Sequence, residues 1–253
     1  MKKYTQADFN AFEVIDGIKQ CPSGDYSDIQ IFGERCSFGR CCSFGEYCSF
    51  GKWCSFGEGC SFGERCSFGR CCSFGECCSF GKWCSFGEGC SFGECCSFGE
   101  GCSFGKQCSF GRACSFGRAC SFGRACSFGE WCSFGEDCSF GEECSFGKGC
   151  SFGKQCSFGE CCSFGECCSF GKGCSFEDKG EYIGDYPFLA FVGFGSRIGS
   201  KVYFFNLQDG IYVRCGCWLS DIAGFRERVK AENADAMYLD LCDLVERKFD
   251  RKN

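Results

Sequence analysis

Cysteine thiols are the side chains whose number and spacing could support chemistry in this sequence. The chain of 253 residues holds 34 Cys and no His, and a cysteine begins each of twenty-four consecutive six-residue units from Cys36 to Cys174. Thiolates bind soft metal ions such as Cu(I), and adjacent thiols can form disulfides. Cysteine-based metal binding or redox chemistry is therefore one hypothesis for this protein.

Ten further cysteines lie outside the leading position. Six end a six-residue unit: Cys41, Cys71, Cys77, Cys95, Cys161 and Cys167. The other four are Cys21, Cys215, Cys217 and Cys242. Cys215 and Cys217 form a Cys-Gly-Cys pair, but no second pair follows, and a structural zinc site usually needs four ligands. We therefore assign no catalytic residue, no metal ligand and no cofactor from the sequence.

The repeated unit has the pattern of a short β-strand followed by a turn. Each unit begins Cys-Ser-Phe-Gly and continues with a charged and a variable residue, except that Glu177 replaces the glycine in the last unit. Strand alternation places Cys and Phe on one face and Ser on the other. The glycine follows where the chain must turn, a position that can require a positive φ. One unit cannot bury its own Phe, so stacking of units must create the core.

The interior is predicted to consist of Phe rings and Cys thiols. Burial among apolar groups raises the pKa of a thiol and makes it inert, so packing is the favoured role of the leading cysteines. On the first side of the coil the predicted structural core is Cys36, Phe38, Cys54, Phe56, Cys72, Phe74, Cys90, Phe92, Cys108, Phe110, Cys126 and Phe128.

Three units are predicted to close one coil of 18 residues, although two units would give a flat alternative. In the middle of the repeat Arg112, Arg118 and Arg124 are followed by Glu130, Glu136 and Glu142. A three-unit coil places these Glu directly above these Arg, with coils about 4.8 Å apart. In such a coil Cys77 and Cys95 share one corner in successive coils, where they could form a disulfide or share a soft metal, although chance placement is favoured.

Written from its aromatic residue, the unit is Phe-Gly-[Glu/Lys/Arg]-x-Cys-Ser. This pattern resembles the hexapeptide repeat of left-handed parallel β-helices, with Phe and Cys in place of the usual aliphatic and small residues. The resemblance implies a three-sided, left-handed solenoid. Its best-known members, acyltransferases and zinc carbonic anhydrases, depend on histidine, so the resemblance implies neither activity for a chain without His. The segment 194–222 resembles the ends of uncharacterised repeat proteins of gut bacteria and their phages.

Both ends of the repeat are predicted to carry caps, because a solenoid exposes unpaired strand edges. Residues 1–35 form the predicted N-terminal cap, 36–179 the β-helix of about eight coils, and 180–253 a small α+β domain.

The N-terminal cap is predicted to contain a helix and a hairpin. Thr5 and Asp8 form a capping box at the start of the helix. The hairpin turns at Asp16-Gly17.

The C-terminal domain is predicted to combine three strands with two helices. The strands cover 188–193, 201–206 and 211–215. Ser220 caps a helix to about Glu232, and a second helix covers about 234–251. The domain is either a plain cap or a recognition and oligomerisation module.

The favoured function is a non-enzymatic scaffold or macromolecule-binding rod, encoded by a phage or another mobile element. The second hypothesis is the cysteine-based metal or redox protein, and the third is a DNA mimic that inhibits a DNA-acting enzyme. Twelve basic and fourteen acidic residues between 36 and 176 leave no face uniformly negative, which weighs against mimicry. The exposed aromatics Tyr47, Trp53, Trp83 and Trp131 are expected on different faces and coils, without a common stacking platform.

The expected partners are proteins or a second copy bound through the C-terminal domain, without a membrane and without nucleic acid, since the net charge is −6. The N-terminal sequence lacks the apolar segment of a secretory signal, and a cytoplasmic location with reduced thiols is predicted.

Overall fold

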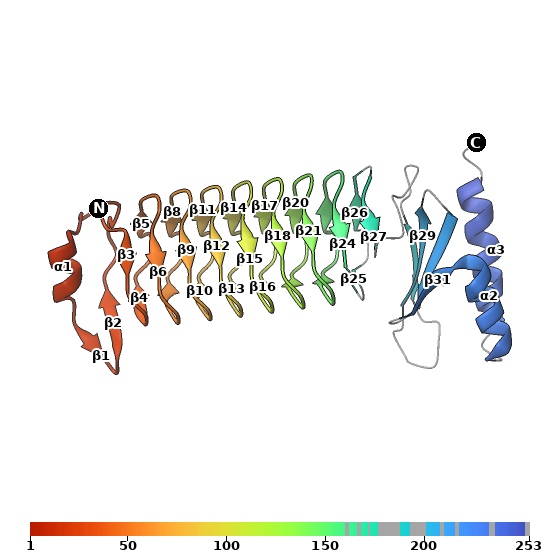
Figure 1. Cartoon of the computed structure of the whole chain (residues 1–253), viewed down its shortest axis with the longest axis horizontal. Helices are drawn as coiled ribbons and strands as arrows, with labels where there is room; N and C mark the ends of the chain where they lie inside the picture. Colours follow the sequence, from red (N-terminus) through yellow and green to blue (C-terminus); the bar gives the residue numbers. More distant parts are fainter. Residues whose placement is uncertain are drawn as a thin grey trace.

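The repeat region coils into a parallel β-solenoid with three sheets along its length, as the computed structural model shows (Figure 1). The structure describes residues 1–159, 162–165, 168–171, 173–176, 188–192, 201–207, 210–215, 218–232 and 236–250. Ser37 pairs with Ser55 and Phe38 with Phe56, so each strand pairs with the strand 18 residues later. This register confirms the three-unit coil and excludes the 12-residue alternative.

From β3 onward, each sheet of the solenoid collects every third strand of the chain. The first sheet contains β1 (Val14–Ile15), β2 (Ile18–Cys21), β4 (Cys36–Phe38), β7 (Ser55–Phe56), β10 (Ser73–Phe74), β13 (Ser91–Phe92), β16 (Ser109–Phe110), β19 (Ser127–Phe128), β22 (Ser145–Phe146) and β25 (Ser163–Phe164). The second contains β5 (Ser43–Phe44), β8 (Ser61–Phe62), β11 (Ser79–Phe80), β14 (Ser97–Phe98), β17 (Ser115–Phe116), β20 (Ser133–Phe134), β23 (Ser151–Phe152) and β26 (Ser169–Phe170). The third contains β3 (Ile31–Phe32), β6 (Ser49–Phe50), β9 (Ser67–Phe68), β12 (Ser85–Phe86), β15 (Ser103–Phe104), β18 (Ser121–Phe122), β21 (Ser139–Phe140), β24 (Ser157–Phe158) and β27 (Ser175–Phe176).

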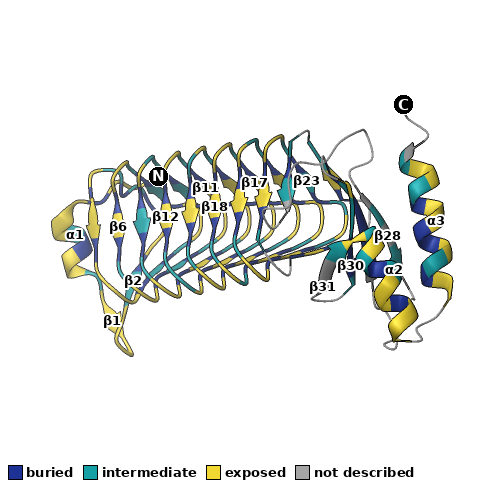
Figure 2. Cartoon of the chain, turned by 45° about the vertical axis from the view of Figure 1, so that its right-hand side comes forward, coloured by how far each residue is buried: buried dark blue, intermediate teal, exposed yellow. Residues whose placement is uncertain are grey.

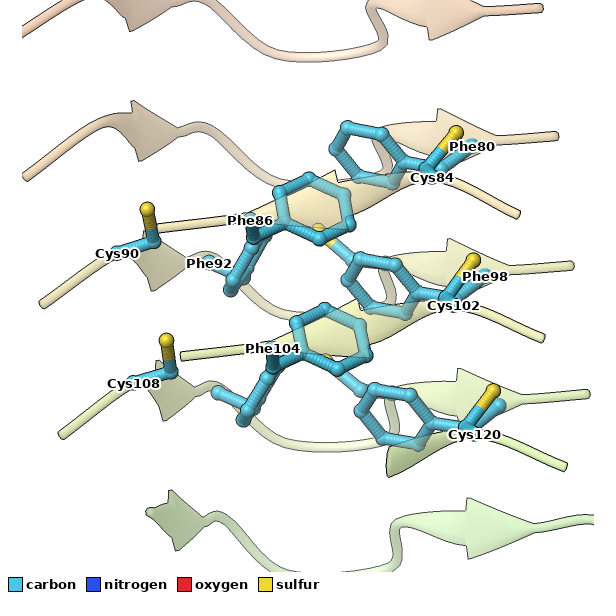
Figure 3. Close-up of a cluster of buried hydrophobic side chains, with 14 of the residues drawn as sticks. Phe80, Cys84, Phe86, Cys90, Phe92, Phe98, Cys102, Phe104, Cys108 and Cys120 are labelled. Carbon is cyan, nitrogen blue, oxygen red and sulfur yellow. The ribbon is translucent and has the colours of Figure 1, made fainter. Parts of the chain in front are cut away.

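Phenylalanine rings fill the interior in three columns, one under each sheet (Figure 3). Within a column the rings of Phe80 and Phe98 are nearly parallel, with centroids 4.8 Å apart. Between columns the rings of Phe80 and Phe86 meet edge to face at 5.0 Å and 88°. Both geometries are favourable for aromatic quadrupoles and add about 0.5–1.5 kcal/mol per pair to the gain from burial. The Phe columns are therefore the principal stabilising element of the rod.

The glycine after each Phe has a different role from the predicted one. None of the described glycines at this position has a positive φ. A Cβ on Gly93 would instead lie 2.7 Å from the backbone N of Glu76 in the preceding coil. Only glycine lets successive coils approach this closely, whereas the positive φ falls on the last residue of each unit, such as Cys77 at 57°. The prediction of a positive φ at this glycine was wrong because the neighbouring coil sets the constraint.

The N-terminal segment begins with α1 (Gln6–Ala11), for which Thr5 and Asp8 form the predicted capping box. The hairpin β1–β2 turns at Asp16-Gly17, as predicted. Strand β2 pairs in parallel with β4, and β3 pairs with β6, so the parallel sheets extend into the segment assigned to the N-terminal cap.

An irregular coil thus precedes Cys36. Cys21 pairs with Phe38, the ring of Tyr26 stacks on Phe44, and Phe32 stacks on Phe50. A cysteine, a tyrosine and a phenylalanine therefore occupy the three inward positions that phenylalanine alone takes in the later coils.

The C-terminal region forms a four-stranded antiparallel sheet covered by two helices. Its elements are β28 (Phe188–Val192), β29 (Lys201–Leu207), β30 (Gly210–Cys215), β31 (Trp218–Asp221), α2 (Ile222–Ala231) and α3 (Met237–Asp250). The three predicted strands are confirmed within one residue over the described range. The helix cap is a correction: the Asp221 carboxylate accepts from the Gly224 N–H, and Ser220 lies in β31.

Candidate functional site

The leading cysteines line the inside of the solenoid in three columns, beside the Phe rings (Figure 3). Each thiol from Cys54 onward lies within hydrogen-bond distance of the carbonyl oxygen of a glycine 21 residues earlier; the Cys102 Sγ is 3.4 Å from the Gly81 O. The thiols therefore act as weak donors between coils as well as filling space.

Hydrogen bonds between neighbouring thiols and burial both act on these cysteines. The hydrogen bond with Cys108 and burial raise the pKa of the Cys90 thiol to about 12, although the hydrogen bond with Cys72 lowers it. Hydrogen bonds within a column act in opposite directions on successive members, since they raise the pKa of Cys60 and lower that of Cys78 to about 4. Burial inside the coil keeps reagents and metal ions away from all of these thiols. All twelve residues assigned to the structural core on the first side of the coil are buried, with at most 5 % exposure.

Of the cysteines that end a six-residue unit, called the outer cysteines below, the described ones differ from the leading cysteines in exposure. Cys41, Cys71, Cys77 and Cys95 are exposed and free. Cys41 faces Gly59 and Cys71 faces Gly89 in the next coil. Cys77 instead has Cys95 beside it, which helps to raise the pKa of Cys77. No disulfide joins these four residues. Cys161 and Cys167 lie outside the described residues.

Within the described ranges, no group of three or more Cys, Asp or Glu side chains is placed to hold a metal ion. Of the predicted Cys-Gly-Cys pair, Cys215 is half-buried in β30, while Cys217 lies outside the described residues.

The exposed aromatic side chains are arranged differently from the expectation. Tyr47, Arg65 and Trp83 share one corner in three successive coils. The Arg65 guanidinium lies 5.7 Å from the Tyr47 ring centroid and 5.1 Å from that of Trp83. A Cβ on Gly101 would lie 2.5 Å from the far side of the Trp83 ring. The expectation that these aromatics fall on separate faces was wrong for Tyr47 and Trp83, but neighbours cover both faces of the Trp83 ring.

Side chains of opposite charge pair between successive coils along the outside of the solenoid. The predicted pairs Arg112–Glu130, Arg118–Glu136 and Arg124–Glu142 are present, each at 3.8 Å. Exposed pairs of this kind contribute about 0–1 kcal/mol each. Their main effect is on register, because a shift by one unit would change the partners of every charge.

The C-terminal sheet closes the end of the solenoid through buried polar contacts. The Tyr203 O–H donates to the Phe164 carbonyl, and an Arg214 N–H donates to the Cys162 carbonyl at 2.9 Å. Arg214 is only 4 % exposed. Phe205 and Leu207 join the Phe core on the same side of the sheet. These contacts cover carbonyls at the end of the first sheet, which would otherwise be left unpaired.

Sequence reasoning missed Arg214 and Tyr203. Both lie in correctly predicted strands, and their neighbours Val213 and Phe204 face the helices instead. The available signal was strand alternation. An arginine on the side of the sheet that faces away from the helices must contact either solvent or another part of the protein.

We expect Arg214→Ala to weaken the cap by about 2–3 kcal/mol, because it leaves the Cys162 carbonyl unpaired under the sheet. Amide hydrogen exchange of the last coil is expected to accelerate, and the rods are expected to associate end to end in analytical ultracentrifugation. The exposed Arg228→Ala is the matched control and is expected to leave both measurements unchanged. Unchanged exchange in Arg214→Ala would show that the buried guanidinium does not hold the cap.

None of the described helices is both long and apolar enough to cross a membrane. Searches against protein-family models, curated proteins and solved structures found no match to this chain.

Proposed function

We propose that this protein is a non-enzymatic scaffold, a rod of defined length that presents its C-terminal domain to a protein partner or to a second copy. The observation that carries the proposal is the buried junction of Arg214 and Tyr203 with the last coil. Because the junction is buried, the orientation of the C-terminal domain is tied to the number of coils. Eight coils give a rod of about 38 Å.

The outward side of the C-terminal helices is the proposed partner surface. Figure 2 shows exposed residues on α2 and α3 beyond the end of the rod. Met237 and Leu244 are 53 % and 48 % exposed and are seven residues apart in α3, so they lie on the same side of the helix. Exposed apolar side chains on one helical stripe are typical of a contact with another protein.

Sequence duplication supports a role that depends on length. Residues 36–65 nearly recur as 66–95, a copy of five units that is not a multiple of the 18-residue coil. Such copying moves the outer residues to new sides but always adds whole units to the rod. It favours a spacer over a side-specific active site, and it suits a gene that expands by repeat slippage, as in a phage or another mobile element.

We also propose that the solenoid is a left-handed β-helix of the hexapeptide-repeat type, without the histidine-dependent activities of its best-known members. The buried, reduced thiols suit a reducing compartment, and we propose a cytoplasmic location. The interleaved ion pairs favour the scaffold over DNA mimicry, which needs a continuous negative face.

Deletion of residues 90–107 removes one whole coil and tests the scaffold role. We expect the shortened chain to keep its β circular dichroism and to capture the same proteins from a host extract as the full chain. The surface variant Leu244→Lys is expected to lose this capture while its fold persists. Loss of all capture by the one-coil deletion, with the fold intact, would contradict a spacer role.

A further inference from the structure

One exposed corner places two thiols in direct succession on the surface of the rod. Cys77 and Cys95 end units that are 18 residues apart, and they share the same left-handed backbone conformation, with φ of 57° and 60°. The rings of Phe74 and Phe92, three residues before the two cysteines in the same units, are 4.8 Å apart. Equivalent atoms of the two cysteines are therefore also about 4.8 Å apart.

This spacing matches the coordination chemistry of soft closed-shell ions. Cu(I) prefers thiolate ligands and accepts two of them in a line. With metal–sulfur bonds of roughly 2.2–2.3 Å, the two sulfurs are about 4.5 Å apart. A disulfide needs sulfurs about 2.05 Å apart, and at this backbone spacing both side chains would have to rotate toward each other to form one. Two side chains left in equivalent positions keep their sulfurs near the separation that a bridging Cu(I) ion needs.

We propose that Cys77 and Cys95 form a two-thiolate binding site for one Cu(I) ion. Binding displaces one proton from each thiol, so that two thiols and Cu⁺ give a dithiolate–Cu(I) complex of charge −1 and two H⁺, and no atom changes oxidation state. Zn(II) is not expected to bind tightly, because it needs about four ligands and the described residues offer no group of three.

Carboxylates surround this thiol pair. Glu76 and Glu94 directly precede the two cysteines, and neither makes an ion pair with another described residue. The negative potential of these carboxylates draws cations to the corner. The nearest cationic side chain along this corner, Arg112, is 3.8 Å from Glu130 in the opposite direction.

Proton release makes the proposed binding dependent on pH. Each of the two thiols must lose a proton before it can bind Cu(I), so acidification opposes metal binding. The apparent Cu(I) affinity is expected to fall by up to about 100-fold for each unit of decreasing pH, because two protons compete with one ion.

Two other exposed cysteines provide matched controls within the same chain. Cys41 and Cys71 have the same backbone conformation as the pair, but each faces a glycine in the next coil. Alanine is a tolerated replacement, since Ala occupies the same unit position at Ala113, Ala119 and Ala125 with φ of 54–58°.

The test is a titration of reduced, full-length protein with Cu(I), under anaerobic conditions, in competition with a chromophoric Cu(I) chelator. We expect one tightly bound ion per chain. Cys77→Ala and Cys95→Ala are each expected to lower the affinity by at least about 100-fold, whereas Cys41→Ala and Cys71→Ala leave it unchanged. Circular dichroism monitors the fold of each variant, and an X-ray absorption spectrum is expected to show two sulfur ligands.

Three results would overturn the site: no tight Cu(I) in the wild-type chain, equal affinity in Cys77→Ala, or Zn(II) bound as tightly as Cu(I). Binding of many Cu(I) ions per folded chain would also overturn it, because the ions would then be entering the inner thiol columns. None of these results bears on the scaffold role, which the coil deletion tests separately.

Discussion

Replacement of Gly93 by Ala is expected to destabilise the solenoid by at least about 4 kcal/mol, among the largest effects of a single methyl group. The added Cβ would lie 2.7 Å from both the Glu76 N and the Gly75 C of the preceding coil. These are backbone atoms within a stack held on both sides, so they cannot move aside without breaking interstrand hydrogen bonds such as that from the Gly93 N–H to the Phe74 carbonyl, at 2.9 Å. The urea midpoint of unfolding measures the change.

The matched control for Gly93→Ala is Gly89→Ala, four residues earlier. Gly89 has a positive φ of 71°, but a methyl group added to it would meet only the Cys71 Sγ, at 3.5 Å. Only the left-handed backbone conformation opposes alanine there, at about 1 kcal/mol. Equal destabilisation by the two substitutions would show that backbone conformation, and not the approach of coils, explains the glycine after Phe.

Native protein is expected to expose very few of its 34 thiols to a thiol reagent. The leading cysteines should react at least about 10³-fold more slowly than the exposed ones, because reaction requires local opening of the coil at a cost of several kcal/mol. Ellman's reagent, followed over time with and without guanidinium chloride, measures both classes. Denatured chain is expected to react completely.

The same experiment has a sharp internal comparison. Cys77 is exposed and its chain neighbour Cys78 is fully buried, so mass spectrometry after brief alkylation should find label on the first and none on the second. Rapid labelling of Cys78 and most other leading cysteines in the native chain would contradict a sealed thiol core.

Local spacing was sufficient to predict the solenoid. The Cys-Ser-Phe alternation predicted which side chains are buried, and the order of Arg112 and Glu130 predicted the 18-residue register, which Ser37 and Ser55 confirm. Handedness stays a prediction from the resemblance. Three of the four strands and both helices of the C-terminal region followed from ordinary hydrophobic alternation, whereas β31 was missed and the helix cap shifts to Asp221.

Features that depend on contacts between coils could not be predicted. The reason for glycine after Phe lies in a backbone 17–18 residues earlier in the chain. The six-residue spacing of Tyr26, Phe32 and Phe38 continues the repeat before Cys36, but the pairing of Cys21 with Phe38 could not be predicted from it. The partners of Arg214 are equally remote, since its N–H bonds to a carbonyl 52 residues away.

By itself, the sequence determined the period and the inward and outward faces of each unit, because these follow from side-chain alternation along a single strand. The tertiary structure alone decided where glycine is obligatory and how the C-terminal sheet contacts the last coil. Those properties arise between coils stacked about 4.8 Å apart. At that separation, backbone atoms and side chains distant in the chain meet, and steric exclusion and hydrogen bonding act on them directly.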